Sequence, residues 1–187
     1  MNEVIKALLE RRSIRQFAPE PIDSHLLNLI LKAALYAPSA RASQATHLTA
    51  LTNPEKIAEL DQAVKAASRQ PGFDKYAAFV SRPEYSINFN GAPVFIIAGA
   101  HREDAFCPAE DGALVLAQLM LAAHSLDLGS CWVNQLAPIG EEPGFRARLT
   151  ALGFPATHLV IGCLALGRRE GANPSAQPRK EGRINTI

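Results

Sequence analysis

The sequence predicts an α+β fold, in which helices pack on a sheet of four or five short strands and one long helix is central. Amphipathic stretches with helical spacing occur in the same chain as apolar runs of strand length. Residues 108–127 are apolar on nearly every side, as expected for a central helix. The 187 residues are 48% hydrophobic and 20% charged, so we expect 1–187 to form one domain.

Two helices are predicted near the N-terminus. The first is short and amphipathic, with its apolar stripe formed by Val4, Ile5, Leu8 and Leu9. Asp23 or Ser24 can cap a second helix that continues to about Tyr36. The residues predicted to face inward from this second helix are Leu26, Leu27, Ile30, Leu31 and Ala34.

The middle of the chain alternates between loops, strands and helices. Residues 37–44 are mostly small and predict a loop, 47–52 alternate as in a strand, and Asn53-Pro54 begins a third helix. Residues 70–92 are rich in Pro, Gly, Asn and aromatic residues, which favours a long irregular connection that carries function. Residues 93–98 form a continuous apolar run, which indicates a buried strand.

The second half of the chain contains the clearest helix, residues 108–127. Pro108 begins it, and its apolar surface indicates burial on all sides, or burial half in its own subunit and half in another. Leu128-Gly129 ends it. Strands at 130–134 and 157–166, with a short helix at 145–152 between them, and a loop at 171–178 before a basic tail complete the predicted elements.

Composition argues against several classes of protein. The formal net charge of +1 is too small for a protein held mainly by nucleic-acid phosphates. No apolar run is long enough to cross a bilayer, and the N-terminus lacks a secretory signal, so we expect a cytoplasmic protein without a membrane partner. Neither the three cysteines nor the five histidines show metal-ligand spacing, so no metal site is expected, and the cysteines are predicted to be small buried residues.

The charges are distributed unevenly along the chain. Residues 1–16 carry a net charge of +2 and residues 168–187 a net charge of +3, whereas 17–167 carry −4. The basic ends are either ordinary solvated termini or two segments that fold together around a small anion, such as a cofactor phosphate.

The segment Arg11-Arg12-Ser13-Ile14-Arg15 is the strongest local candidate for binding an anion. If it is extended, residues 11, 13 and 15 point to one side and form a phosphate clamp, because guanidinium groups match phosphate oxygens. The same pattern also fits a helix C-terminus, where bases are favourable. Gly162 and Gly167 have the spacing of a P-loop, but the Lys and Ser/Thr of that motif are missing, so we interpret this match as coincidence.

Four stretches in order resemble the nitroreductase family over nearly the whole chain. They are RRSIRQF near the start, the loop APSARASQ, EDGALVLAQLMLAAHSLDLGSCW over residues 110–132, and HLVIGCLALG before the basic RKEGR ending. The resemblance implies a mostly antiparallel sheet and a homodimer that binds FMN in two sites at the subunit interface. It also implies reduction of the flavin by NADH or NADPH, followed by electron transfer to nitroaromatic, quinone or related acceptors in a ping-pong cycle.

The resemblance also implies which residues bind FMN, whereas no side chain is expected to be catalytic because the chemistry resides in the flavin. Arg11 and Ser13 would hold the phosphate with Arg12 beside them, and Arg15 would lie near the pyrimidine edge. Lys180 and Arg183 would close on the phosphate from the tail. The other implied contacts are Pro38, Ser39 and Ala40 from the partner subunit, Asn88, and Trp132, Val133, Asn134 and Gln135.

The chain departs from the family pattern at a few positions. Ala42 stands where members usually have Asn, and Ala45-Thr46 where they often have Pro-Trp, so the role of this loop is open. Asn134 and Gln135 replace common glycines, and Trp132 has an alternative interpretation as a core residue. Alternative functions are flavin fragmentation, reductive dehalogenation, a non-enzymatic FMN carrier or sensor, and a plain anion-binding or interaction module.

Overall fold

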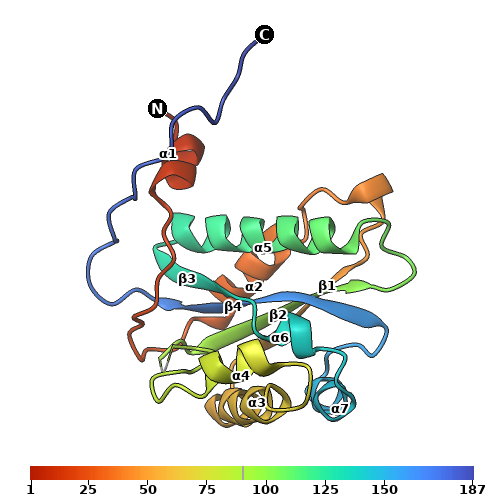
Figure 1. The fold of residues 1–187 in the computed structure, drawn as a ribbon. Helices are drawn as coiled ribbons and strands as arrows, with labels where there is room; N and C mark the ends of the chain where they lie inside the picture. Colours follow the sequence, from red (N-terminus) through yellow and green to blue (C-terminus); the bar gives the residue numbers. More distant parts are fainter. Residues whose placement is uncertain (90) are drawn as a thin grey trace.

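The computed structural model describes residues 1–89 and 91–187, except the side chain of Lys75. A four-stranded sheet lies between two layers of helices (Figure 1). Helices α2 (Ser24–Ala34) and α5 (Pro108–Ser125) cover one face. The other face is covered by α3 (Pro54–Ala67), α4 (Asp74–Val80), α6 (Leu136–Ile139) and α7 (Pro143–Ala151). The α+β prediction is confirmed.

The described strands are β1 (Thr46–Leu51), β2 (Val94–His101), β3 (Leu128–Val133) and β4 (His158–Arg168). They lie in the order β1-β2-β4-β3, and every neighbouring pair is antiparallel. The remaining described elements are α1 (Glu3–Glu10) and a single 3-10 turn, η1 (Ala40–Ala42). Within the described residues, no helix is both long and apolar enough to cross a membrane.

Strand β2 lies in the middle of the sheet and contributes to both cores. Ile96 faces α2 and α5, whereas Phe95 and Ile97 face α3 and the helices beside it. Burial on both faces explains why this strand is a continuous apolar run. Helix α5 lies tightly on β4, because a Cβ atom at Gly112 would come within 2.6 Å of the Ile161 side chain.

The boundaries of several predicted elements are corrected by the structure. The 70–92 connection is not irregular throughout, because α4 forms between the breakers Pro71-Gly72 and Pro83. Strand β3 begins at Leu128 rather than at 130, since Asp127, with φ of 56°, already turns the chain after α5. The one-turn helix α6 and the turn η1 were not predicted; both are too short to show periodicity.

The structure also shows how far two groups of apolar residues are buried. The apolar stripe of α1 is solvent-exposed in the single chain, with Leu8 55% and Leu9 59% exposed. Cys131 and Cys163 are buried as predicted, but Cys107 is half-exposed, because it lies just before the first turn of α5.

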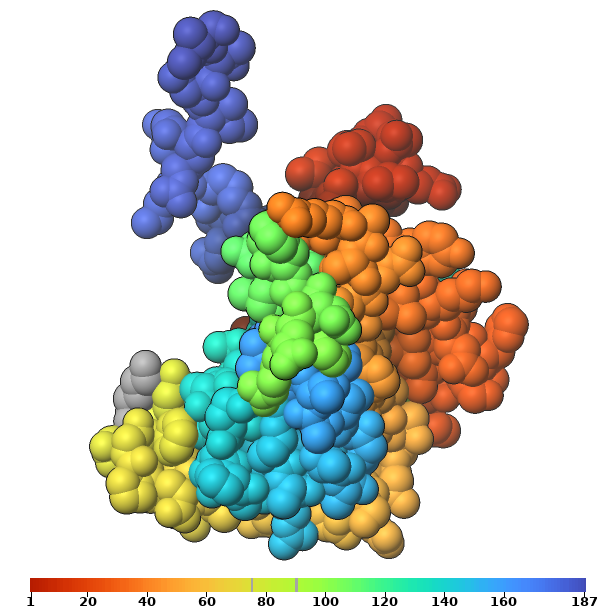
Figure 2. Space-filling model, turned by 90° about the vertical axis from the view of Figure 1, so that its right-hand side faces the viewer, coloured from red at the N-terminus to blue at the C-terminus, as the bar shows by residue number. Residues whose placement is uncertain are grey.

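The two ends of the chain lie side by side along β3 and β4. Ser13 forms a parallel bridge with Ser130, and Phe17 an antiparallel bridge with Arg169, so the segment 13–17 extends the edge of the sheet. Farther along, the Asn173 side chain donates to the Glu10 carbonyl. Residues 171–187 are exposed throughout and extend past α1 and away from the body of the molecule (Figures 1 and 2).

Candidate functional site

The arginine-rich segment after α1 is extended. Helix α1 ends at Glu10, and Arg11 has φ of −57° and ψ of 132°, outside the helical region. The Ile14 N–H then donates to the Ser130 carbonyl at 2.9 Å. This close approach requires glycine at position 129, where a Cβ atom would lie 2.8 Å from the Ile14 side chain. The segment after α1 is therefore extended, and its role as a phosphate clamp stays a prediction.

Three of the predicted phosphate-binding residues gather around the thiol of Cys131. Burial raises the pKa of the Cys131 thiol, while Arg15, the hydroxyl of Ser13 and Arg11 each act to lower it. Residues 11, 13 and 15 therefore all affect the same thiol, as expected when alternate side chains of an extended segment point to one side. The result is a concentration of positive charge beside the end of β3.

Arg11 and Arg12 differ in what they bond to. Arg12 turns back on α1, where its Nη1 donates to the carbonyls of Leu9 and Arg11 at 2.7 Å each. In the part of the chain that the structure describes, Nη1 of Arg11 and Nε of Arg12 are both buried and have no hydrogen-bond partner. A buried guanidinium nitrogen left unpaired is unfavourable, and an anion placed there would satisfy it.

A cleft of about 340 Å³ lies next to this segment. Four of the predicted flavin contacts line it: Arg15, Trp132, Val133 and Gln135. Trp132 is half-buried at the end of β3, and its Nε1 lies 3.4 Å from Oδ1 of the exposed Asn134. The structure therefore brings Arg15 and the end of β3 together around one space, whereas Arg11 lines the neighbouring groove between α1 and α5.

The residues that line the opposite side of the cleft were not predicted from the sequence, which indicated only Asn88 as a contact and a general expectation that 70–92 carries function. We call this side the aromatic wall and define it as residues 79–89, of which Phe79, Arg82, Tyr85 and Phe89 line the cleft. The rings of Phe79 and Tyr85 meet edge-on, with centroids 5.4 Å apart. The stretch holds three aromatic residues and a single base, Arg82, a composition that does not by itself indicate a binding wall.

Asn88 belongs to the aromatic wall but turns away from the cleft. Its Nδ2 donates to the Ala92 carbonyl at 3.0 Å, and its Oδ1 accepts from the Ser86 hydroxyl at 2.6 Å. These bonds hold the turn that leads into β2. The structure thus places Asn88 in a loop-stabilising position rather than among the residues that line the cleft.

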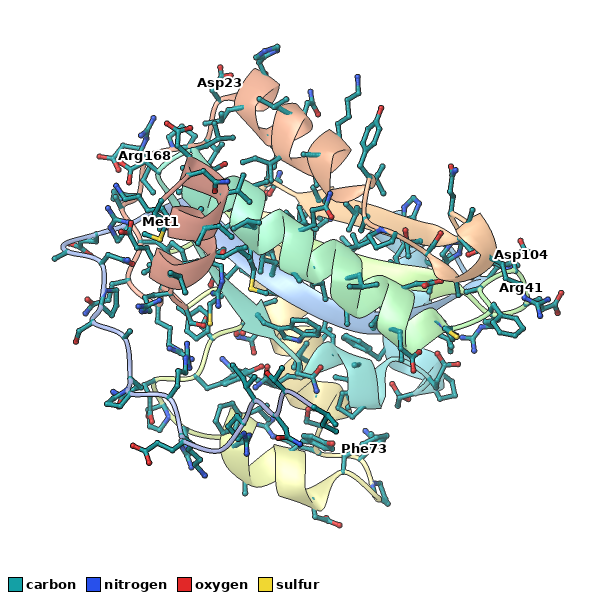
Figure 3. The ribbon with its side chains drawn as sticks, turned by 90° about the horizontal axis from the view of Figure 1, so that it is seen from above. Met1, Asp23, Arg41, Phe73, Asp104 and Arg168 are labelled. Atoms are coloured by element: carbon teal, nitrogen blue, oxygen red, sulfur yellow. The ribbon has the colours of Figure 1, made fainter. Side chains whose placement is uncertain are left out.

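The predicted Pro38–Ala40 contacts lie at the other end of α5. The Ala40 N–H donates to Oδ1 of the buried Asp111 at 2.8 Å, in the first turn of α5. Arg11, in contrast, affects His124 near the last turn of the same helix. The two points are thirteen residues apart, or about 20 Å along a helix. Figure 3 shows Arg41 and Met1 near opposite ends of α5.

The loop around η1 has an unusual backbone conformation. Arg41, Ala42 and Gln44 have φ between 50° and 55°, the left-handed region that favours glycine and asparagine. Besides the bond to Asp111, the loop is held by the Ser39 hydroxyl, which accepts from the Gln44 N–H at 3.0 Å. Such a conformation persists only where surrounding contacts fix it.

Lys180 and Arg183 lie in the exposed tail, and the structure does not bring them to the cleft. Among the described residues, no group of His, Cys, Asp or Glu is arranged to hold a metal ion. Gly162 and Gly167 lie inside β4, where no phosphate-binding turn exists. One chain therefore carries the cleft, the buried Arg11 and the η1 loop, with the loop at the first turn of α5 and Arg11 near the last turn of the same helix.

Comparison with known proteins agrees with this arrangement. A sequence model of the nitroreductase family matches residues 8–168. Curated relatives include an FMN reductase [NAD(P)H] from Bacillus subtilis, 30% identical over 87% of this chain and 66% of the relative. They also include an NADPH-flavin oxidoreductase from Vibrio harveyi, 28% identical over 96% of this chain and 70% of the relative. The chain thus spans about two thirds of the length of these two proteins.

Solved structures show the same fold over the whole chain. A nitroreductase with bound FMN from Bacteroides fragilis has a TM-score of 0.89 and 32% identity, with full coverage of both chains. A nitroreductase with bound FMN from Desulfitobacterium hafniense has a TM-score of 0.84 and 25% identity, covering 100% of this chain and 99% of that one. With the family match spanning most of the sequence, the chain belongs to the nitroreductase family and is an oxidoreductase of that family.

Proposed function

We propose that this protein is an FMN-dependent oxidoreductase that passes electrons from NADH or NADPH to nitroaromatic, quinone or related acceptors. The observation that carries the proposal is the meeting of the arginine segment, the end of β3 and the aromatic wall around one cleft. The FMN-bound relatives support the choice of cofactor. The names of the Bacillus subtilis and Vibrio harveyi relatives support the choice of a nicotinamide donor.

The residues present fit a flavin mononucleotide. The buried, unpartnered Nη1 of Arg11 is a donor suited to a phosphate oxygen, and the Ser13 hydroxyl lies on the same side of the segment. The cleft is lined by aromatic side chains and β-strand backbone, which suit a flat, largely apolar ring. We assign Arg11 and Ser13 to the phosphate, and Arg15, Trp132, Val133 and Gln135 to the ring.

When bound, FMN supplies the redox chemistry, taking a hydride from the nicotinamide and passing two electrons to the acceptor. The protein contributes charge and orientation. Arg15 places a fixed cation beside the cleft, where it stabilises the negative charge that develops on a reduced ring. We assign the backbone N–H groups of Asn134 and Gln135, just after β3, to the edge of the ring that receives the hydride. Solvent supplies the protons.

We further propose that the working unit is a homodimer. We assign the η1 loop to the binding site of a second chain, because within one chain the loop meets the first turn of α5 and Arg11 lies near its last turn, about 20 Å away along the helix. A groove of about 730 Å³ between α1 and α5 is lined largely by apolar residues. Its exposed leucines include Leu8 at 55% and Leu114 at 42%. A second copy that covers this face would bury the α1 stripe and bring its own Pro38–Ala40 loop toward the cleft.

The purified protein tests the proposal directly. We expect a yellow protein with a flavin absorbance spectrum that bleaches when NADH or NADPH is added without oxygen and returns when a nitroaromatic or quinone is added. A flavin that binds but is reduced by neither nicotinamide would favour a carrier or sensor. A colourless protein whose melting temperature does not respond to FMN would overturn the flavin assignment.

A further inference from the structure

The aromatic wall carries a cation to which neither the fold nor the proposed flavin contacts give a role. Arg82 follows α4 and lines the cleft, and its guanidinium lies over the ring of Phe79, 5.1 Å from the centroid. Its neighbours on the same side of the cleft are Tyr85 and Phe89. Arg82 is exposed, so it is available to a molecule entering from solvent.

Both arginines at the cleft are backed by phenyl rings. Arg15 lies over Phe89 at 5.9 Å, as Arg82 lies over Phe79 at 5.1 Å. A guanidinium held against an aromatic face keeps its charge and its donors while losing part of its rotational freedom. The two arginines therefore present preoriented donors toward a space that is otherwise largely apolar.

The charge balance of the cleft favours an anion. Its described charged lining residues are Arg15, Arg82 and Glu84, which leaves an excess of one positive charge. Arg11 adds positive charge from the neighbouring segment, as its effect on Cys131 shows. The ammonium of Lys65 lies 5.7 Å from the centre of the Tyr85 ring, but its charge is balanced by Asp61 at 2.7 Å.

We propose that the aromatic wall selects the electron acceptor and favours planar aromatic molecules that carry a carboxylate or sulfonate. The rings of Phe79, Tyr85 and Phe89 would contact the aromatic part of the acceptor, while Arg82 pairs with its anionic group. Arg82 is then a specificity-determining residue, whereas Arg15 acts on the flavin. This proposal rests on the proposed function, because it names the substrate class of the same site.

The chemical step leaves the anionic group unchanged. Reduction of a nitro group to a nitroso group takes up two electrons and two protons and releases one molecule of water. The electrons come from the nicotinamide by way of the flavin, and the protons come from solvent. Arg82 affects only how well the acceptor binds and is oriented, so its removal should act on acceptors according to their charge.

The test compares matched acceptors with the flavin-loaded protein. The acceptors are 4-nitrobenzoate, which is anionic, and 4-nitrobenzamide, which has the same shape but no charge. We expect Arg82→Ala to lower kcat/KM for the anionic acceptor by about fivefold, the size of one partly exposed charge pair, and to change the neutral one by less than twofold. In the wild-type protein, the preference for the anionic acceptor over the neutral one should also shrink as the salt concentration is raised.

Two further variants control for folding and net charge. Glu84→Gln removes the carboxylate from the same wall, and we expect it to increase the preference for the anionic acceptor. Arg148→Ala removes an exposed cation from α7, a helix that does not line this cleft. This variant should leave kcat/KM unchanged for both acceptors. Binding of 4-nitrobenzoate to the oxidised protein, measured by calorimetry without a donor, should weaken in Arg82→Ala by a similar factor.

Separate half-reactions distinguish the possible failures. If NADH or NADPH does not bleach the flavin of the wild-type protein, the proposed function is wrong. If bleaching is normal but Arg82→Ala affects both acceptors equally or neither of them, the acceptor selectivity is wrong. If Arg82→Ala instead weakens reduction by NADPH and spares reduction by NADH, the cation recognises the phosphate of the donor, and the proposal is overturned in favour of donor selection.

Discussion

We propose that Arg11 is the residue on which binding of the FMN phosphate depends most. Its Nη1 is buried without a partner among the described residues. Arg11→Ala should weaken FMN affinity by about 1.5–3 kcal/mol, because a charged hydrogen bond to phosphate is lost. Fluorescence titration of the flavin-free protein measures this loss, with Arg148→Ala as the control of equal charge. Unchanged affinity in Arg11→Ala would remove Arg11 from the site.

Arg15 should act on the flavin's potential more than on its affinity. A fixed cation beside the ring favours the reduced form, which carries negative charge. Arg15→Ala should therefore lower the midpoint potential by roughly 20–40 mV, the two-electron equivalent of about 1–2 kcal/mol. Arg15→Lys should restore part of the shift. A potential that stays the same in Arg15→Ala, measured by spectroelectrochemistry, would place this charge away from the ring.

The residues around the cleft show how far the sequence alone could lead. Arg11, Ser13 and Arg15 could be identified because alternation in an extended segment needs only the order of residues. Arg82 and Phe79 could not, since their place in the cleft depends on how α4 packs on the rest of the chain. Asn88 was assigned by position in the family pattern, but its hydrogen bonds are set by its own turn.

At the scale of elements, regular structure was predicted better than its boundaries. The β2 run and α5 were predictable because burial on all sides leaves few polar residues. Short elements such as α6 were not predicted, since four residues are too few to show the helical repeat of apolar residues. The stripe of α1 was predicted as apolar but is exposed in one chain, because a sequence pattern shows that a face is apolar but not which molecule covers it.

The η1 loop contains Ala42, one of the positions at which the chain departs from the family pattern. Ala42, where Asn is usual, has φ of 53°, a conformation that asparagine tolerates and alanine resists. Ala42→Gly should raise the free energy of unfolding by about 0.5–1 kcal/mol by removing this strain, and Ala42→Asn should have the same sign. Ala40→Gly, at a position without positive φ, should lower the stability. Urea denaturation measures all three, and a destabilised Ala42→Gly protein would contradict the account.

Three histidines at one end of the sheet predict sensitivity to acid. The His158 ring lies 5.6 Å from that of His47 and 5.1 Å from that of His101, where the ends of three strands meet. Burial lowers the pKa of His47. The pKa of His158 is lowered by burial first and then by His47, His101 and Arg146, with Asp104 opposing. Figure 2 shows the chain around residues 101–107 and 155–160 side by side on this face.

The sign of the effect follows from the lowered pKa values. The folded protein favours the neutral form of His47 and His158, so their contribution to stability is complete above about pH 6.5, the pKa of an unfolded histidine. It is lost as the pH falls below that value toward the lower pKa of the folded state. The melting temperature should therefore decline below pH 6.5, and less steeply in His158→Phe. In the control His25→Gln, at an exposed position, the melting temperature should decline as it does in the wild type. If the melting temperature of His158→Phe also declines as steeply as that of the wild type, the histidine cluster is excluded as the cause.

At the scale of the whole molecule, the apolar face between α1 and α5 predicts self-association. Leu114→Glu places a charge in this face and should convert the proposed dimer to a monomer that no longer retains FMN. Light scattering after size exclusion measures the mass, and absorbance measures the flavin content. Ala147→Glu, on the exposed side of α7, should stay dimeric and yellow. A monomeric wild-type protein would contradict the proposed interface.

The central claim is that each FMN lies between the cleft of one chain and the η1 loop of the other. Mixed dimers test it: one chain carries Arg11→Glu in the cleft segment, and the other carries Ala40→Trp in the loop. Each variant alone should bind no flavin. If the site is shared between chains, the purified mixed dimer contains one doubly altered site and one unaltered site. We predict one FMN per mixed dimer, bound with wild-type affinity; a mixed dimer that binds no FMN tightly would show that cleft and loop serve the same chain.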